Sequence, residues 1–185
     1  MSSYYEALSP LFERAAAQHV EHKVKAASAT VTDRGTFEAL VAAWTVDRGG
    51  DRIQPGAFAG SIASWRAAAK PVPLHWDHKS DPQFVIGRID DMRETAEGLW
   101  VKGQLDLQGS EVAREAWRAM RSGAIGASFG YLTKKSHHEG DVHVLDELDL
   151  FEVSLTPAPM NSDTRVLSMK STPRREPSRI ASFDA

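Results

Sequence analysis

The chain has 185 residues, of which 42% are hydrophobic and 25% charged, with no cysteine and a net charge of -3. This composition is typical of one globular domain, and it excludes a disordered chain, a thiol nucleophile, a disulfide framework and Cys-ligated metal sites. The charge gives no broad basic field, and no stretch approaches the ~20 apolar residues of a membrane span. We therefore expect a soluble intracellular protein that binds neither nucleic acid nor membrane.

The two ends of the chain differ in character from its middle. Residues 1–25 carry a short amphipathic pattern that Pro10 interrupts, which is typical of a short helix or of a mobile arm. Residues 169–185 are rich in Pro, Ser and Arg, and we predict that this tail is disordered. The folded domain is therefore expected at 26–168.

The first half of this domain predicts a strand, a helix and a hairpin. Residues 37–46 form an apolar run that predicts a strand. Residues 57–70 place apolar side chains at helical spacing and predict an amphipathic helix. Residues 84–94 and 98–107 alternate on either side of a TAEG turn, so they predict a β-hairpin that turns at Gly98.

The second half predicts one helix and two long strands. Residues 109–123 carry one apolar stripe, with Ser110 suited to cap the start of a helix and Gly123 its end. Residues 124–135 and 141–157 have strand patterns and flank the polar segment SHHEG, which we predict to be a loop.

Ser128 lies in IGASFGY, in the predicted strand that follows this helix. Its neighbours Gly126 and Gly130 are small, which lets a substrate backbone approach and leaves the hydroxyl accessible, as a nucleophile requires. A strand pattern rather than a helix follows, which disfavours the nucleophile elbow of α/β-hydrolases. From the spacing alone, a structural serine in a buried strand is the favoured alternative.

Two histidines, His75 and His78, lie in VPLHWDHKSDP, an extended stretch that ends in a loop. A loop histidine titrates near neutrality and can take a proton from a serine on another strand. Alternation along the stretch sends the two histidines to opposite sides, so only one is expected to face a site. A pair of surface histidines is the alternative.

A metal site is a further alternative, because six residues offer nitrogen or oxygen ligands: His75, Asp77, His78, His137, His138 and His143. None stands in a helical H-E-x-x-H pattern, and solvated side chains are usual in a polar loop such as SHHEG. We therefore expect no metal and no cofactor. A metal-dependent hydrolase would lose its activity to a chelator.

The last predicted strand carries four carboxylates that alternate with apolar residues: Asp146, Glu147, Asp149 and Glu152. Strict alternation turns Leu148, Leu150 and Glu152 toward one face, which places an acid among core residues. Such a carboxylate needs a partner, and a histidine that becomes charged during catalysis is one. A rim carboxylate or an ordinary salt bridge is the alternative.

Five segments together resemble the caudovirus prohead protease family, capsid maturation serine proteases related in fold to herpesvirus assemblins. They are VDRGGDRIQPGAF (46–58), VPLHWDHKSDPQFVIGRI (72–89), GLWVKGQL (98–105), AIGASFGY (124–131) and LDLFEVSLTPAPMNSDTRV (148–166). Each segment is unspecific alone, but together they follow the order of the family.

This resemblance implies roles for individual residues. The family's histidine stands in a W-x-H segment before an I-G strand, which is His78 here, with His75 as a neighbour. The family's serine stands in a small-residue strand that ends in Gly-aromatic, which is Ser128.

The third catalytic residue follows from the E-V-S-L segment, which points to Glu152. This chain has PAPMN where the family has P-A-N, so Glu147 and Asp149 remain alternatives. Backbone N–H groups near Gly126 and Ala127, or near Gly109 and Ser110, are the candidates for holding the oxyanion.

The resemblance also implies the fold and the function. The fold would be α+β, a mainly antiparallel β-barrel with surrounding helices of the assemblin kind. The protein would be a serine endopeptidase inside the phage procapsid, in the cytoplasm of the bacterial host, as a homodimer or higher oligomer. Its substrates would be the scaffold or the scaffolding segment of the major capsid protein, and the enzyme itself, with the tail removed by self-cleavage. A non-catalytic capsid assembly module is the alternative.

Overall fold

The computed structural model describes residues 33–171, so the predicted arm at 1–25 and most of the predicted tail lie outside the described residues. The strands are β1 (Asp33–Ala43), β2 (Asp51–Ile53), β3 (Val72–Trp76), β4 (Val85–Glu94), β5 (Gly98–Leu105), β6 (Gly126–Glu139), β7 (Val142–Thr156) and β8 (Arg165–Ser171). The helices are α2 (Ala59–Ala68), α3 (Glu111–Arg121) and a 3₁₀ turn, η1 (Pro82–Phe84).

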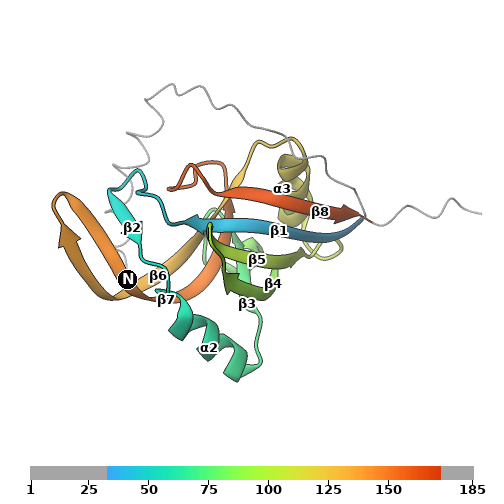
Figure 1. Ribbon diagram of the computed structural model, residues 1–185. Coiled ribbons are helices and arrows are strands. Elements are labelled where there is room, and N and C mark those ends of the chain that lie inside the picture. Colours follow the sequence, from blue (N-terminus) through green and yellow to red (C-terminus); the bar gives the residue numbers. More distant parts are fainter. Residues whose placement is uncertain (1–32, 172–185) are drawn as a thin grey trace, which may run out of the picture.

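The strands form one curled, mixed sheet in the order β2-β7-β3-β4-β5-β1-β8, and β6 pairs with β7 off this path (Figure 1). β7 pairs with β6 in antiparallel fashion along most of its length. On its other edge it pairs in parallel with β2 at 143–145 and with β3 at 153–155. The curl also brings β6 against β1 and β8. β7 is therefore the strand around which the other strands are organised.

The sheet meets the predicted fold class only in part. The pairs β1–β5, β1–β8, β3–β4, β4–β5 and β6–β7 are antiparallel, as expected of an antiparallel barrel. The parallel pairs β2–β7 and β3–β7 were not predicted. In these pairs, β2 and β3 follow one another along the same edge of β7, with α2 between them in the chain.

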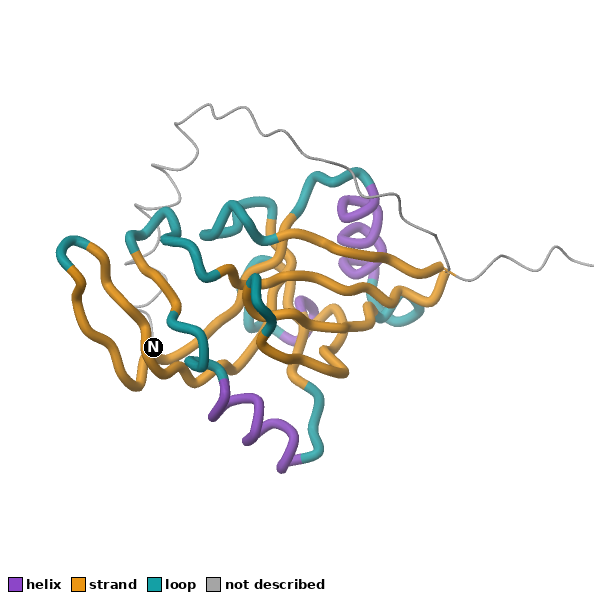
Figure 2. The backbone as a smooth tube through the Cα atoms, viewed as in Figure 1, coloured by secondary structure: helices purple, strands orange, loops and turns teal. Residues whose placement is uncertain are grey.

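The predicted helix at 57–70 is confirmed as α2, which takes the place of a strand along part of β7 (Figure 2). The Ser61 hydroxyl donates to the Leu148 carbonyl at 2.8 Å and accepts from the Leu150 N–H at 2.9 Å. The Trp65 indole N–H donates to the Leu150 carbonyl at 2.8 Å. These side chains satisfy backbone groups between the stretches of β7 that β2 and β3 cover.

Replacing Ser61 by Ala is expected to destabilise the fold by about 1–3 kcal/mol, because it leaves two buried backbone groups of β7 without their partner. Ser64→Ala is the matched control, since Ser64 is exposed on the same helix. Urea denaturation of both variants measures the difference. Equal midpoints would show that the Ser61 bonds contribute nothing net.

The predicted helix at 109–123 is confirmed as α3, together with both of its caps. The Ser110 hydroxyl accepts from the Ala113 N–H at 3.1 Å, and Gly123 follows the helix with a φ of 71°. The stripe of α3 that enters the main hydrophobic core consists of Ala113, Ala116, Trp117 and Met120.

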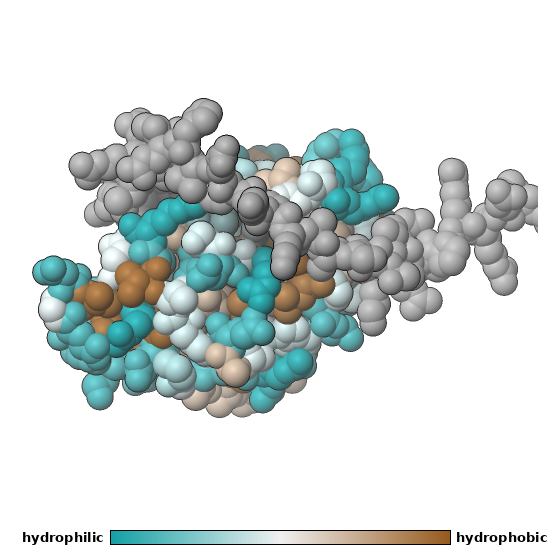
Figure 3. Space-filling view, turned by 45° about the horizontal axis from the view of Figure 1, so that its top comes forward, coloured by the Kyte–Doolittle hydropathy of each residue, from teal (hydrophilic) through white to brown (hydrophobic). Residues whose placement is uncertain are grey.

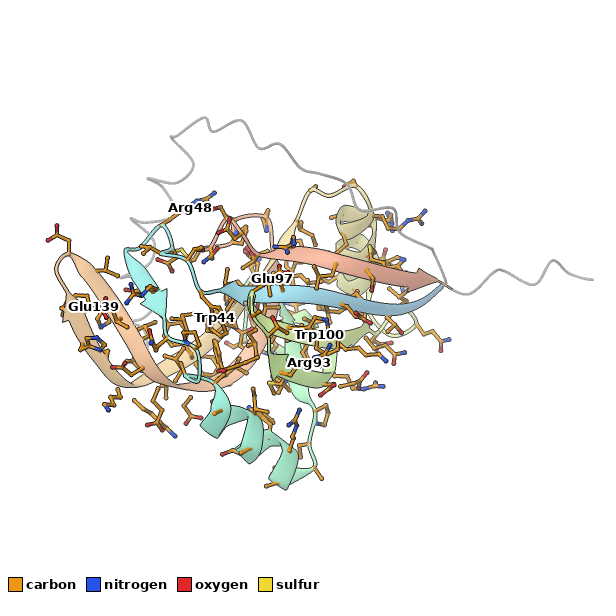
Figure 4. The ribbon with its side chains drawn as sticks, in the orientation of Figure 1. Trp44, Arg48, Arg93, Glu97, Trp100 and Glu139 are labelled. Carbon is orange, nitrogen blue, oxygen red and sulfur yellow. The ribbon has the colours of Figure 1, made fainter. Side chains whose placement is uncertain are left out.

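The predicted hairpin at 84–107 is confirmed as β4 and β5, with Gly98 at the turn. A side chain on Gly98 would meet the Ala42 carbonyl oxygen at 1.8 Å, so the glycine lets β1 approach this turn. The Trp44 indole N–H donates to the Thr95 carbonyl at 3.0 Å, and Arg93 lies 3.5 Å above the Trp100 ring (Figure 4).

The predicted loop SHHEG is wrong, because β6 continues through Glu139 and the chain turns at Gly140 and Asp141. The resulting β6–β7 hairpin projects from the sheet, with Glu139 near its far end (Figures 1 and 4). Facing polar side chains bond across the two strands, as His137 does to Asp146 at 2.8 Å. Such cross-strand pairs stabilise a strand whose sequence looks like a loop.

The face of the molecule in Figure 3 is largely hydrophilic, with a few apolar patches. Within residues 33–171, no helix is long and apolar enough to cross a membrane. The last strand, β8, runs to Ser171, and Met169 on it is buried in the core.

Candidate active site

The turn that carries His78 is held against the end of β7. β3 ends at Trp76, and the next two residues, Asp77 and His78, have left-handed φ angles of 53° and 57°. The Asp77 N–H donates to the Leu155 carbonyl at 2.9 Å, and the Thr156 hydroxyl donates to the Asp77 carboxylate at 2.7 Å. These bonds stabilise a backbone conformation that is costly for residues other than glycine.

Because of this turn, the alternation expected along residues 72–78 stops at Trp76. Asp77 and His78, which alternation sends to opposite sides, both bond to side chains of β7. His75 pairs in register with Ser154 and is a neighbour of the site, as the resemblance implies.

His78, Glu152 and Ser154 form a compact hydrogen-bonded group. His78 Nδ1 lies 2.7 Å from Glu152 Oε1, and the Ser154 hydroxyl donates to Glu152 Oε2 at 2.7 Å. The His78 backbone N–H donates to the same Ser154 hydroxyl at 3.1 Å. Ser154 thus fixes both the carboxylate and the backbone of the histidine.

This geometry determines how the His78 ring can act. A carboxylate accepts hydrogen bonds, so Nδ1 carries the proton and Nε2 is the acceptor nitrogen of the neutral ring. Glu152 is almost fully buried, whereas the His78 side chain is 26% exposed. A buried acid behind a partly exposed imidazole is the arrangement of a general base and the residue that orients it.

Ser128 faces this group from β6. It pairs in register with Ser154, and two residues away in each direction Gly126 pairs with Thr156 and Gly130 with Glu152. Directly opposed residues of an antiparallel pair project to the same face, with Cβ atoms about 4.5–5.5 Å apart. The Ser128 side chain therefore lies on the same face as Ser154 and Glu152, and it is 8% exposed.

A β-bulge at Phe151 brings Glu152 to this face. The register moves from Gly130–Glu152 to Tyr131–Leu150, so Phe151 is an extra residue on β7. Strict alternation placed Glu152 on the face of Leu148 and Leu150, and this prediction is wrong. Leu150 and Val153 both belong to the core although they are three residues apart, so the alternation changes phase between them and Glu152 turns away from the core.

The two glycines nearest Ser128 make room for side chains of the protein itself. A Cβ on Gly130 would lie 2.5 Å from Glu152 Oε1 and 2.5 Å from the Phe151 ring. A Cβ on Gly126 would lie 2.8 Å from the ring of Pro159.

The alternative acids lie elsewhere on β7. Glu147 is exposed and pairs in register with Lys135. Asp149 pairs with Leu132 and lies 3.8 Å from the Lys134 ammonium. Of the three candidates, Glu152 is the one hydrogen-bonded to His78.

One pair of candidate oxyanion donors already has partners. The Gly109 N–H donates to the Asp106 carboxylate at 2.8 Å, and the Ser110 N–H donates to the Asp106 carbonyl at 3.1 Å. Gly126 and Ala127 lie in the β6–β7 ladder, paired with Thr156 and Leu155, and the role of either segment stays a prediction.

Ser154 and Thr156 of the site were missed in the sequence, and Asp77 was considered there only as a metal ligand. Glu152, Ser154 and Thr156 are polar residues at every second position, and they alternate with the apolar Val153 and Leu155. That period marks a polar stripe on one face of a strand, and it was the signal that could have found the two hydroxyls.

Two of the three histidines of the β6–β7 hairpin bond to carboxylates. His137 bonds to Asp146 and Glu139, and His143 Nδ1 lies 3.0 Å from an Asp51 oxygen. His138 stacks on His143. Among residues 33–171 there is no group of three or more histidine or carboxylate side chains that would hold a metal ion.

The hydrogen bonds to Asp146 and Glu139 raise the pKa of His137 above its ordinary value of 6.5. The charged ring and its ion pairs thus persist to higher pH, and they are lost as the pH rises through the raised pKa. Asp146→Asn is expected to lower the titration midpoint of His137, measured by NMR. Asp141→Asn, at the exposed turn of the same hairpin, is the control, and an equal shift in both variants would contradict the assignment.

Comparisons with known proteins agree with the resemblance seen in the sequence. The family model described as caudovirus prohead serine protease matches residues 22–176. The prohead protease of Enterobacteria phage HK97 is 29% identical over 147 residues, which are 75% of this chain and 61% of that relative. The chain thus spans about three-fifths of the length of this curated relative.

Two solved structures are similar at low sequence identity. The bacteriophage T4 capsid assembly protease matches with a TM-score of 0.56 and 13% identity, over 65% of this chain and 80% of that one. This likeness shows a shared fold. The varicella-zoster virus protease matches with a TM-score of 0.43 and 14% identity, over 71% of this chain and 62% of that one, a score too low to support an inference. From the extent of the family match, the chain belongs to the caudovirus prohead serine protease family.

Proposed function

We propose that the chain is a serine endopeptidase of phage capsid maturation, with Ser128 as nucleophile, His78 as general base and Glu152 as the orienting acid. The observation that carries this proposal is the bond of 2.7 Å between His78 Nδ1 and the buried Glu152 carboxylate, on the sheet face that Ser128 shares. Family membership supports the serine protease activity.

The mechanism follows the chemistry of these three side chains. The Ser128 oxygen attacks the scissile carbonyl while His78 Nε2 takes its proton. The imidazolium that forms is stabilised by Glu152, and it then gives its proton to the leaving amine. A water molecule, activated by the same histidine, hydrolyses the acyl-enzyme and regenerates Ser128.

The hydrogen bonds around Glu152 keep the site in order before substrate arrives. Ser154 donates a hydrogen bond to one carboxylate oxygen and His78 donates to the other. The hydrogen bonds of Glu152 are therefore already in place when the histidine becomes charged. Such preorganisation of charged groups is a major source of enzymatic rate enhancement.

The proposed substrates are the scaffold or the scaffolding segment of the major capsid protein, and the enzyme itself. The relatives are named as prohead and capsid assembly proteases, which favours this class. We place the reaction in the procapsid, in the cytoplasm of the bacterial host, with the enzyme as a homodimer or higher oligomer. Confinement in a shell gives a high local concentration, so narrow specificity is not required. The finer fold type, an antiparallel barrel of the assemblin kind, belongs to the same proposal.

Coexpression with the cognate major capsid protein tests the proposal. Intact mass is read for both proteins with wild type, Ser128→Ala and the control Ser136→Ala, an exposed serine on the same strand. Trimming that occurs with wild type and Ser136→Ala but is lost with Ser128→Ala is expected. Assembled shells with untrimmed capsid protein in all three would favour the non-catalytic assembly module. Trimming that survives Ser128→Ala but stops with a chelator would favour a metal-dependent hydrolase.

A further inference from the structure

An apolar groove of about 310 Å³ lies between α2 and the β6–β7 pair. Its volume is at the lower end of the ~300–1,000 Å³ that ligand pockets span. It is lined by residues of these elements: Ser64, Trp65 and Ala68 on α2, Leu132 on β6, and Leu150 and Phe151 on β7.

The groove opens on the same face of the sheet as Ser128. β6 alternates without interruption from Ser128 through Gly130 to Leu132, so these residues project to one side. On β7, the bulge residue Phe151 lies beside Glu152 opposite Gly130, and its ring occupies the space where a Gly130 side chain would be. Phe151 therefore lines the groove and also lies beside Glu152 of the proposed catalytic group.

Most residues that line the groove are apolar, and the position of one of them, Trp65, is fixed by a hydrogen bond. The Trp65 indole is held by its bond to the Leu150 carbonyl. Leu132 is 63% exposed and Phe151 is 46% exposed, and these are two of the four large apolar side chains exposed in the described residues. Two such side chains at one groove offer apolar area that an apolar ligand would cover.

We propose that this groove binds an apolar side chain of the substrate, two to four residues from the scissile bond. Ser128 and Leu132 are four residues apart on one strand, about 13 Å at ~3.3 Å per residue, and Gly130 lies halfway. An extended substrate that runs along β6 rises by the same amount per residue. A side chain two to four positions from the bond cut by Ser128 thus reaches between Phe151 and Leu132.

The inference rests on the proposed function, because it uses Ser128 to place the scissile bond. Asp149, in register with Leu132, adds a carboxylate to the groove wall. We therefore expect an acidic side chain to be rejected at this position of the substrate.

A bacterial proteome digested with trypsin is the substrate library for the test, with cleavage sites read by mass spectrometry. Wild-type cleavages that Ser128→Ala lacks are expected to show one apolar position two to four residues from the cut. Leu132→Ser and Phe151→Ser are each expected to lower kcat/KM for such peptides about tenfold and to flatten the preference. Val46→Ser is the matched control, since Val46 is 48% exposed outside the groove.

A binding measurement separates this inference from the proposed function. Ser128→Ala protein is titrated with N-acetyl-leucinamide, and a saturable shift of the Trp65 indole N–H signal is expected by NMR. If cleavage shows no apolar preference, or if both groove variants keep the wild-type preference, the role of the groove in substrate binding is rejected. The proposed protease activity then still stands. If the Trp65 signal shifts but no cleavage depends on Ser128, the proposed protease activity is rejected. The groove then remains a binding site for an apolar side chain. Absence of the shift overturns the groove in either case.

Discussion

Glu152→Gln is expected to lower kcat/KM by about 10⁴-fold without unfolding the protein, as the corresponding change does in a Ser-His-Asp triad. The carboxylate accepts one hydrogen bond from His78 and another from Ser154. A glutamine has only one acceptor oxygen, so its amide N–H₂ must face one of these two donors. The His78 ring then loses its partner or takes the wrong tautomer.

The rate of capsid-protein trimming, together with the thermal midpoint, measures this effect. Glu147→Gln is the matched control, since Glu147 is exposed on the same strand and was an alternative acid in the sequence. If trimming is lost in Glu147→Gln and is normal in Glu152→Gln, the role of the orienting acid belongs to Glu147.

Gly130→Ala is expected to lower kcat/KM at least a hundredfold, although the substitution adds one methyl group. The new Cβ would lie 2.5 Å from Glu152 Oε1, the oxygen that binds His78. The carboxylate or the strand must move, and a displacement of about 1 Å can cost 10²-fold in rate. Overpacking of this kind also destabilises a fold by about 1–3 kcal/mol.

Gly60→Ala is the control, because Gly60 lies in α2 and its nearest neighbour to a new Cβ is a Glu147 oxygen at 3.9 Å. It is expected to leave the rate unchanged and to stabilise the protein by about 0.5–1 kcal/mol. Kinetics and urea denaturation of the two variants test this pair. Wild-type kinetics in Gly130→Ala would show that the Phe151 ring moves to make room for the methyl group and that Glu152 keeps its position.

The features that the sequence predicted are local. The cap at Ser110 and the turn at Gly98 depend on a few neighbouring residues, and the structure has both. The hairpin of β6 and β7 was predicted too short, because its polar end is stabilised by pairs such as His137 with Asp146 that lie nine residues apart. β2 has three residues, and it is a strand only because β7 lies beside it.

The site shows the same limit. The resemblance pointed to His78, Ser128 and Glu152, and the structure brings Glu152 to His78 and turns it to the face of Ser128. Alternation failed at Phe151, because a bulge is a property of two paired strands rather than of one. Alternation failed again at Asp77, where a hydrogen bond from Thr156 stabilises a left-handed turn. The local sequence does not predict this turn.

The place of β7 in the chain has a consequence for protein synthesis. β2, β3 and β6 all pair with β7, and all three are translated before it. The contacts of β2 and β3 with so distant a strand form late, and strands without their partner stay exposed until then. A nascent chain that has reached Asp141 already contains His78 and Ser128, yet it lacks the strand on which both are assembled. Under the proposed mechanism, the ribosome therefore has to complete β7 before this chain can cut a peptide.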